Sequence, residues 1–213
     1  MASQNIEGDL RILDGDIVLL SDGKRLLPDI QRDWIEQTTL AKFNLPPHTW
    51  GVWDSGQPLP ATAASDDLGY EVGTFGADAP RLTAGDLKAA GATTRRARRT
   101  VDIPAEYDSG QTVQIRLAAG MLTTIADTSC TIDVEAYKIG RDGLKTGSDL
   151  VSTAAMTMNS TVVGDKTFEV TAGALTPGDK LDVRISITCT DAATGTVVKP
   201  IIADLDLLCD IRG

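Results

Sequence analysis

The sequence predicts a mostly β protein built as an antiparallel two-sheet sandwich, and three observations lead to that prediction. Apolar and polar residues alternate one by one along at least six segments after residue 94. Glycine, proline, aspartate and serine separate these segments, and no amphipathic helix pattern lies between them. Strands with one dry and one wet face are typical of antiparallel sheets, and a series of short strands with such turns favours a sandwich.

The expected strands follow one another through the second half of the chain. They cover residues 101–103, 113–117, 130–137, 168–170, 181–189 and 201–211. Turn-forming residues occupy 108–110, 140–143, 164–165, 177–179 and 191–195. A jelly roll is the topology we expect, because the strands are long and their connections differ in length. An immunoglobulin-like order stays open, because periodicity does not determine which strands are neighbours.

Residues 1–80 lack the regular alternation of the later segments. They are predicted to form an N-terminal arm that precedes a sandwich domain at 81–213. Within the arm, residues 17–27 read as a short hairpin that turns at Ser21-Asp22-Gly23. A short helix is expected after Pro28, with Ile30 and Trp34 at helical spacing. The helix must end before Pro46 and Pro47, which have no N–H to donate.

Residues 46–80 are rich in Pro, Gly, Ala, Ser and Asp and contain Trp50 and Trp53. Such a stretch has little periodicity, yet it carries aromatic side chains that a free linker does not need. We expect an extended arm that becomes ordered against a neighbouring protein. The alternative is a long loop that folds over its own domain.

Composition limits the classes of function. The 213 residues carry a formal net charge of −10, which argues against binding to nucleic acids or acidic membranes. No apolar run approaches the roughly 20 residues that cross a bilayer, and the first residues lack the features of a secretory signal. Aromatic residues make up 4% of the chain, so the core must consist of Val, Ile, Leu and Ala. Cys130, Cys189 and Cys209 are expected to be separate buried thiols in a protein made in a reducing cytoplasm.

Motifs for catalysis and for metal or cofactor binding were sought, and none was found. The chain has a single histidine, His48, which stands in a proline-rich stretch. Acidic residues share one strand face at Asp133 and Glu135 and again at Asp204, Asp206 and Asp210, and carboxylates two apart could serve glycoside hydrolysis or calcium binding. Alternating acids also arise wherever one face of a strand is wet, and this is the interpretation we prefer. We therefore expect no enzyme activity, no metal and no cofactor.

The one basic cluster, residues 95–99, leads directly into the first clear strand. Guanidinium groups form forked bonds with carboxylates, so this cluster is a candidate for contacts across a subunit boundary. A solvated strand whose charges protect a sheet edge is the alternative. The candidate protein-contact residues are Trp34, Trp50, Trp53, Arg95, Arg96, Arg98 and Arg99.

Several stretches between Leu82 and Gly213 resemble virion proteins of tailed bacteriophages and prophages. They are LKAAGATT at 87–94, VDIPAEY at 101–107, AGMLTT at 119–124, IDVEAYK at 132–138 and LLCDIRG at 207–213. Within that group the chain is similar to capsid decoration (cement) proteins with a jelly-roll domain. The resemblance implies a trimer on the outer surface of the capsid, with a terminal arm that clamps neighbouring capsid subunits.

The sequence thus leads to a structural virion protein that binds the major capsid protein and further copies of itself. The alternative is a carbohydrate- or receptor-binding module of a phage fibre, which requires exposed aromatic side chains on the sandwich. A hydrolase on a β scaffold is the third hypothesis, and it requires a cleft with paired acids.

Overall fold

The structure is a computed structural model that describes residues 40–88, 91–123, 128–191 and 196–211 and the backbone of three short strands before residue 20. Two 3-10 turns, η1 (Pro47–Thr49) and η2 (Ala172–Ala174), are the helical elements of this part of the chain. Among the residues described, no helix is long and apolar enough to cross a membrane.

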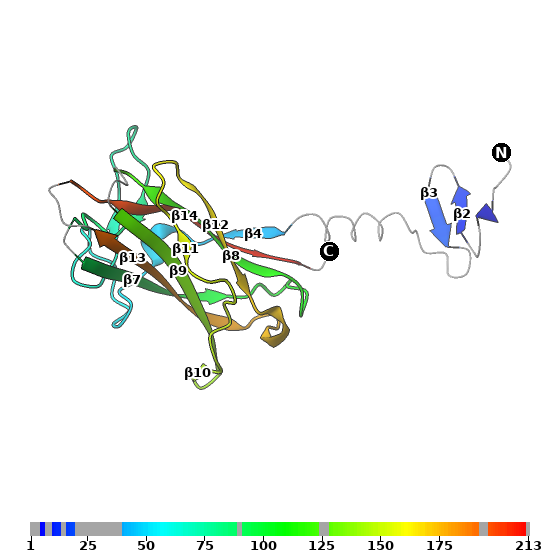
Figure 1. Cartoon of the computed structure of the whole chain (residues 1–213). Coiled ribbons are helices and arrows are strands. Elements are labelled where there is room, and N and C mark those ends of the chain that lie inside the picture. Colours follow the sequence, from blue (N-terminus) through cyan, green and yellow to red (C-terminus); the bar gives the residue numbers. More distant parts are fainter. Residues whose placement is uncertain are drawn as a thin grey trace.

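Two antiparallel sheets form the body of the molecule (Figure 1). The first has the order β12 (Gly164–Val170), β8 (Val113–Met121), β14 (Pro200–Cys209), β6 (Arg81–Thr83), β5 (Gly69–Glu71), and β4 (Ala41–Asn44) also pairs with β14. In the second, β9 (Thr128–Ile139) pairs with β13 (Lys180–Asp191), β10 (Lys145–Thr146) and β11 (Met156–Thr157). Strand β7 (Gly91–Asp102) lies beside β13, and the hydroxyls of Thr94 and Thr188 are 2.8 Å apart across the two strands.

The long strands change sheet at every step along the chain. β9 and β13 belong to one sheet, with β7 beside β13, and β8, β12 and β14, which alternate with these three in sequence, belong to the other. This wrapped connectivity is that of a jelly roll. The predicted antiparallel sandwich is therefore confirmed, and the strand order favours the jelly roll over the immunoglobulin-like alternative.

The alternation in the sequence becomes the two faces of each strand. On β13, Leu181, Val183, Ile185 and Ile187 are fully buried, whereas the residues between them are half-buried on the outer face. β9 and β8 follow the same pattern, because successive side chains of a strand point to opposite faces. Their inward residues form one core between the sheets.

The predicted domain boundary at residue 80 is corrected, because residues 40–80 are part of the sandwich. Strand β4 pairs with the end of β14, and the Leu45 N–H donates to the Leu205 carbonyl at 2.8 Å. Trp50 is 2% exposed and Leu68 is 0% exposed, and both belong to the common core. The extended arm expected at 46–80 is therefore wrong for this stretch, and the alternative of a loop folded over its own domain describes it.

The physical reason is the open edge of β7. The stretch 46–68, which we call the strap, runs along this edge and satisfies its backbone groups. Arg98 exchanges two backbone hydrogen bonds with Gly51, each of 2.9 Å. The Leu68 N–H donates to the Arg96 carbonyl at 2.8 Å, and the Arg96 N–H donates to the Asp66 carbonyl at 2.7 Å. Because an unpaired edge strand exposes donors and acceptors, covering it stabilises the monomeric fold.

Three short strands near the N-terminus form a sheet of their own. They are β1 (Asn5–Ile6), β2 (Leu10–Leu13) and β3 (Asp16–Leu19), in the order β1–β2–β3. β3 pairs with the strand before it, so the hairpin involves residues upstream of the predicted one at 17–27. The predicted turn at Ser21-Asp22-Gly23, the predicted helix after Pro28 and the candidate contact Trp34 lie outside the described residues.

Two of the cysteines are not the separate thiols that were expected. The register of β9 and β13 places Cys130 directly opposite Cys189, with a Cα–Cα distance of 4.1 Å, and the two form a disulfide. Cys209 is a buried thiol, as expected. Burial is the main reason why its pKa is raised, to about 11.

Replacing Trp50 tests whether the strap belongs to the folded domain. We expect Trp50→Ala to lower the free energy of unfolding by about 3–5 kcal/mol, because it leaves a large cavity in the core. Phe75→Ala is the matched control: Phe75 is fully exposed in the loop between β5 and β6 and should change stability by less than about 0.5 kcal/mol. Urea unfolding monitored by circular dichroism measures both, and equal effects of the two changes would contradict the buried position of Trp50.

Thiol counting tests the disulfide. In denaturant without reductant we expect one reactive thiol per chain, that of Cys209, and three after reduction. In the native protein at pH 8 we expect almost no reaction, because the buried Cys209 thiol, with a pKa of about 11, stays protonated. Three reactive thiols in unreduced, denatured protein would show that the bond between β9 and β13 does not form.

Candidate functional site

The strap and the outward face of β7, β13 and β9 form a surface with two hollows, which we call the strap face. The larger hollow, of about 420 Å³, lies between the strap and β7 and is lined by His48, Trp50, Arg98 and Arg99 among others. The smaller hollow, of about 330 Å³, is lined by Trp53, Arg98, Tyr137, Lys145, Asp182 and Arg184. Arg98 borders both, so the two hollows adjoin along β7.

Alternation along β7 divides the four arginines into two pairs. Arg96 and Arg98 point outward, toward Trp53 and Asp182 respectively. Arg95 and Arg99 share the inward face with the buried Ala97. The Arg95 guanidinium donates to the carbonyl of Ala84 and, at 3.3 Å, to that of Ser65.

A tight turn of the strap holds Trp53 over the second sheet. The Val52 N–H donates to the Gln57 carbonyl at 2.7 Å and the Gly56 N–H to the Val52 carbonyl at 2.9 Å. The Trp53 indole N–H donates to Asp66 at 2.8 Å. The guanidinium carbons of Arg96 and Arg184 lie 5.3 and 5.7 Å from the ring centroid. These are cation–π distances, so two guanidinium groups of the same chain help to hold the indole ring in place.

Tyr137 forms the opposite wall of the smaller hollow. The Lys145 ammonium lies 3.2 Å from the centroid of the Tyr137 ring, and the Tyr137 hydroxyl donates to Glu135 at 3.3 Å. Burial and the neighbouring carboxylate of Glu135 raise the pKa of Tyr137, in that order of importance. Tyr137 is therefore a neutral hydrogen-bonding group at neutral pH.

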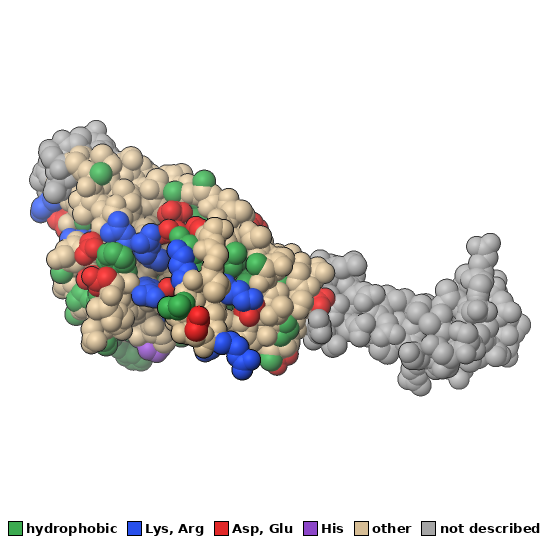
Figure 2. Space-filling model, turned by 90° about the horizontal axis from the view of Figure 1, so that it is seen from below, with side chains coloured by type: hydrophobic (Ala, Val, Ile, Leu, Met, Phe, Trp, Pro, Cys, Tyr) green, Lys and Arg blue, Asp and Glu red, His purple; other side chains and the backbone are tan. Residues whose placement is uncertain are grey.

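Two arginines that line the smaller hollow, Arg98 and Arg184, form ion pairs within the chain. Arg98 donates to the two oxygens of Asp182 at 2.6 and 2.7 Å, and this hydrogen bonding raises the pKa of Arg98. Arg184 donates to Glu135 Oε2 from Nε at 2.6 Å and from Nη2. Basic and acidic side chains are likewise interspersed over the face of the sandwich in Figure 2, rather than separated into patches of one sign.

The strap face contains most of the contact residues predicted from the sequence. Trp53 and Arg98 line the smaller hollow, Arg96 packs against the Trp53 ring, and Arg98 and Arg99 border the larger hollow. Trp50 lines the larger hollow but is mainly a core residue, and Arg95 is bonded to backbone carbonyls.

Sequence reasoning missed three residues of this surface: Tyr137, Lys145 and Arg184. Tyr137 and Arg184 stand at wet positions of two predicted strands. That alternation was the one signal available for them, because the sequence does not show that these strands are neighbours.

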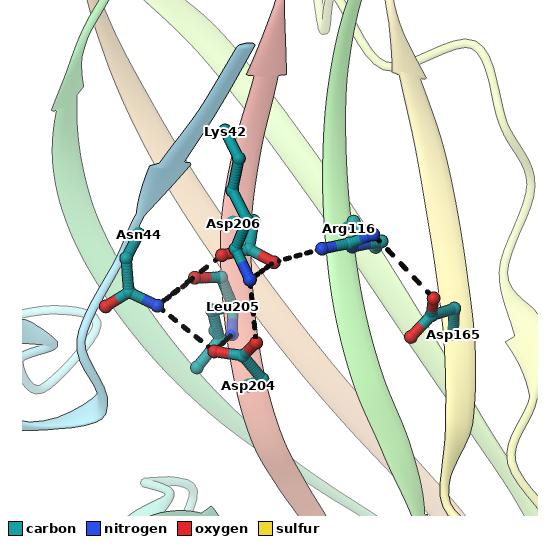
Figure 3. Close-up of polar contacts among 7 residues, drawn as sticks. All are labelled: Lys42, Asn44, Arg116, Asp165, Asp204, Leu205 and Asp206. Carbon is teal, nitrogen blue, oxygen red and sulfur yellow. Dashed lines mark hydrogen bonds and ion pairs between the residues drawn. The ribbon is translucent and has the colours of Figure 1, made fainter. Parts of the chain in front are cut away.

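The predicted acid pairs lie on different sheets, and Glu135, Asp204 and Asp206 form ion pairs with cations. Asp133 and Glu135 are on β9, where burial is the main cause of the raised pKa of Asp133. Asp204 and Asp206 are on β14 and contact Lys42, Asn44 and Arg116 (Figure 3). The preferred interpretation, that these acids lie on the wet faces of strands, holds for the half-buried Asp133, Glu135 and Asp204 but is wrong for Asp206, which is buried. Within the described ranges no three His, Cys, Asp or Glu side chains are placed to hold a metal ion.

Asp206 is the center of a polar cluster that fastens β4 to the first sheet (Figure 3). The residue is 1% exposed although it points away from the core. Its carboxylate lies 3.1 Å from the Lys42 ammonium and 2.8 Å from Arg116 Nη2, and Asn44 Nδ2 donates to it at 3.4 Å. Hydrogen bonding to Asp206 is the largest cause of the raised pKa of Lys42 and of Arg116.

Comparison with known proteins gives structural neighbours only. The chain matches no protein-family model and no curated protein. A xylan-binding CBM22-1 domain of Paenibacillus barcinonensis Xyn10C is 7% identical over 81% of this chain and 95% of its own, with a TM-score of 0.40. The xylan-binding module CBM15 is 13% identical over 82% and 99%, with a TM-score of 0.42.

A viral structure is also among these neighbours. The structure of the infectious bursal disease virus Gt strain is 13% identical over 63% of this chain and 30% of its own, with a TM-score of 0.35. All three TM-scores are below 0.5, so we argue the function from the groups on the strap face.

Removing the Asp206 carboxylate tests the polar cluster. We expect Asp206→Ala to lower the free energy of unfolding by about 2 kcal/mol, because Asn44 and the two cations lose their common acceptor. Asp165→Ala is the control: its carboxylate is 63% exposed and lies 3.9 Å from Arg116, so its loss should cost less than about 0.5 kcal/mol. Denaturant unfolding compares the two, and an unchanged Asp206→Ala protein would contradict the importance of the cluster.

Proposed function

We propose that this chain is a structural virion protein that binds and stabilises a phage capsid, with the strap face as one of its protein-contact surfaces. The sandwich serves as the folded body, and the major capsid protein and further copies of the chain are its partners. The resemblance of five stretches between residues 87 and 213 to tailed-phage virion proteins supports this assignment.

The composition of the smaller hollow carries the proposal. Trp53, Tyr137, Arg98 and Arg184 line it, and Arg96 packs against the Trp53 ring. Trp, Tyr and Arg are the residue types that contribute most to protein–protein binding energy when a partner desolvates them. They are held in place by hydrogen bonds and ion pairs within the chain, so little side-chain entropy is lost when a partner binds.

The N-terminal strands supply a second element for attachment. β1, β2 and β3 pair with one another, and none of the pairings among the described residues joins them to the sandwich sheets. We assign residues 1–39 to the arm that grips a neighbouring subunit, and the whole chain to a homotrimer on the outer capsid surface. Several linked contacts raise the overall affinity without requiring any single one to be tight.

A carbohydrate- or receptor-binding module of a phage fibre is the second candidate. The observation in its favour is the same hollow, which combines two aromatic rings with forked polar groups, as sites for polar ligands do. A sugar that stacks on these rings must first displace Lys145 from Tyr137 and compete with the guanidinium groups beside Trp53. Each lost cation–π contact costs about 0.5–1 kcal/mol at an exposed site, which is why we rank this candidate second.

Co-sedimentation with heads assembled without this protein tests the proposal. We expect saturable binding, and we expect Trp53→Ala to weaken it at least about tenfold, or about 1.4 kcal/mol, because an anchor side chain is removed from the contact. The control Phe75→Ala changes an exposed aromatic residue in the loop between β5 and β6 and should bind like the unmodified chain. Melting temperatures establish that both variants are folded.

The alternative predicts a different pattern in the same set of measurements. Binding to a glycan array that Trp53→Ala abolishes, together with no affinity for heads, would replace the capsid assignment by the carbohydrate-binding one. A chain that is monomeric at micromolar concentration and binds neither heads nor glycans would overturn both.

A further inference from the structure

The larger hollow of the strap face differs from the smaller one in its charges. Its charged or ionisable lining consists of His48, Arg98 and Arg99, and no acidic side chain is among the described residues that line it. Arg98 is already paired with Asp182 on the other side of the strand. Arg99 is therefore the arginine of this hollow whose charge no paired carboxylate neutralises.

Arg99 is the member of the arginine cluster for which the described residues provide no hydrogen bond and no ion pair. Arg95 donates to two backbone carbonyls, Arg96 lies 3.7 Å from Asp66, and Arg98 forms a forked pair with Asp182. By contrast, Nη1 of Arg99 is buried and has no partner. The carboxylate of Asp102 acts electrostatically on Arg99, but Asp102 forms its ion pair with Lys180, at 2.8 Å.

A half-buried guanidinium without an acceptor is an unfavourable arrangement. Removing a charged group from water costs free energy unless a partner of opposite charge replaces the water. Burial lowers the pKa of Arg99 more than the neighbouring Asp102 raises it, which agrees with a cation that lacks compensation. An anion in the hollow would compensate the charge even without reaching Nη1, because the guanidinium charge is delocalised over its three nitrogens.

We propose that the larger hollow is a carboxylate-binding site in which Arg99 holds an acidic side chain of a partner protein. A carboxylate matches the planar fork of a guanidinium, and Trp50 and His48 form the walls beside it. A hollow of about 420 Å³ has room for a whole acidic side chain. The inference extends the proposed function, on which it rests for the protein nature of the partner, by naming the chemistry that this partner presents.

Titration with a simple carboxylate tests the site without knowledge of the partner. Sodium acetate is added to the ¹⁵N-labelled full-length chain while sodium chloride keeps the ionic strength constant, and amide signals are followed by NMR. We expect saturable shifts at Gly51, Gly56 and Arg99, with a dissociation constant on the order of millimolar, as suits a single small contact. Shifts that do not saturate, or that chloride produces equally, would overturn the proposal.

Matched variants identify the residue responsible. Arg99→Gln removes the charge at similar length and should abolish the saturable shifts. Arg95→Gln changes an arginine on the same face of the same strand, outside the hollow, and should leave them intact. Arg99→Lys retains the charge without the fork and should weaken acetate binding several-fold; it also serves as the test variant if Arg99→Gln does not fold. Acetate binding that both Arg99 variants retain in full would exclude the role of Arg99.

Two peptides and the assembled heads separate this inference from the proposed function. A short peptide with a central Glu should bind more tightly than acetate, and the same peptide with Gln should not bind. Arg99→Gln should also bind heads at least about tenfold more weakly, about 1.4 kcal/mol. Normal binding of Arg99→Gln to heads would overturn the inference and leave the proposed function intact, whereas failure of the unmodified chain to bind heads, with the acetate site present, would overturn the proposed function.

Discussion

The open edge of β7 is the constraint from which the strap face follows. A strand with a neighbour on one side leaves a row of backbone donors and acceptors that must find partners. Gly51, Asp66 and Leu68 supply them, and this brings the strap close against the second sheet. The turn within the strap is itself tight at Gly51, where a Cβ atom would lie 2.9 Å from the Gln57 carbonyl oxygen. With the strap held there, Trp50 is buried in the core and Trp53 lies over the outward face of the second sheet.

The same edge explains how the arginine cluster is divided between the two faces of β7. Arg95 and Arg99 point inward from an edge strand, an arrangement that discourages a foreign strand from pairing there. Arg96 and Arg98 point outward and join the aromatic residues of the smaller hollow. Edge protection and the proposed partner binding thus use alternate residues of one strand, and the proposed carboxylate site uses Arg99 because its inward position leaves Nη1 without a partner.

Sequence reasoning succeeded where the signal is local. The alternation at 181–189 identified β13 because each inward residue of that strand faces one common core. It failed for the strap, since a Pro- and Gly-rich segment has no period and Gly51 finds its partner Arg98 far along the chain. It also failed for Cys130 and Cys189, whose pairing depends on the register of two strands. Tyr137, Lys145 and Arg184 could not be joined to Trp53 for the same reason.

The amino-acid sequence by itself determined the β class, the inward and outward residues of β8, β9 and β13 and the position of the basic cluster, because each depends on neighbours one or two residues away. Only the tertiary structure decided which strands lie side by side, that residues 40–80 belong to the sandwich, and which side chains meet at the two hollows. These depend on strand register and on the covering of one sheet edge, and both bring together residues that are distant in the chain. The chemistry of the strap face is therefore a property of the folded edge of β7 and not of any single motif.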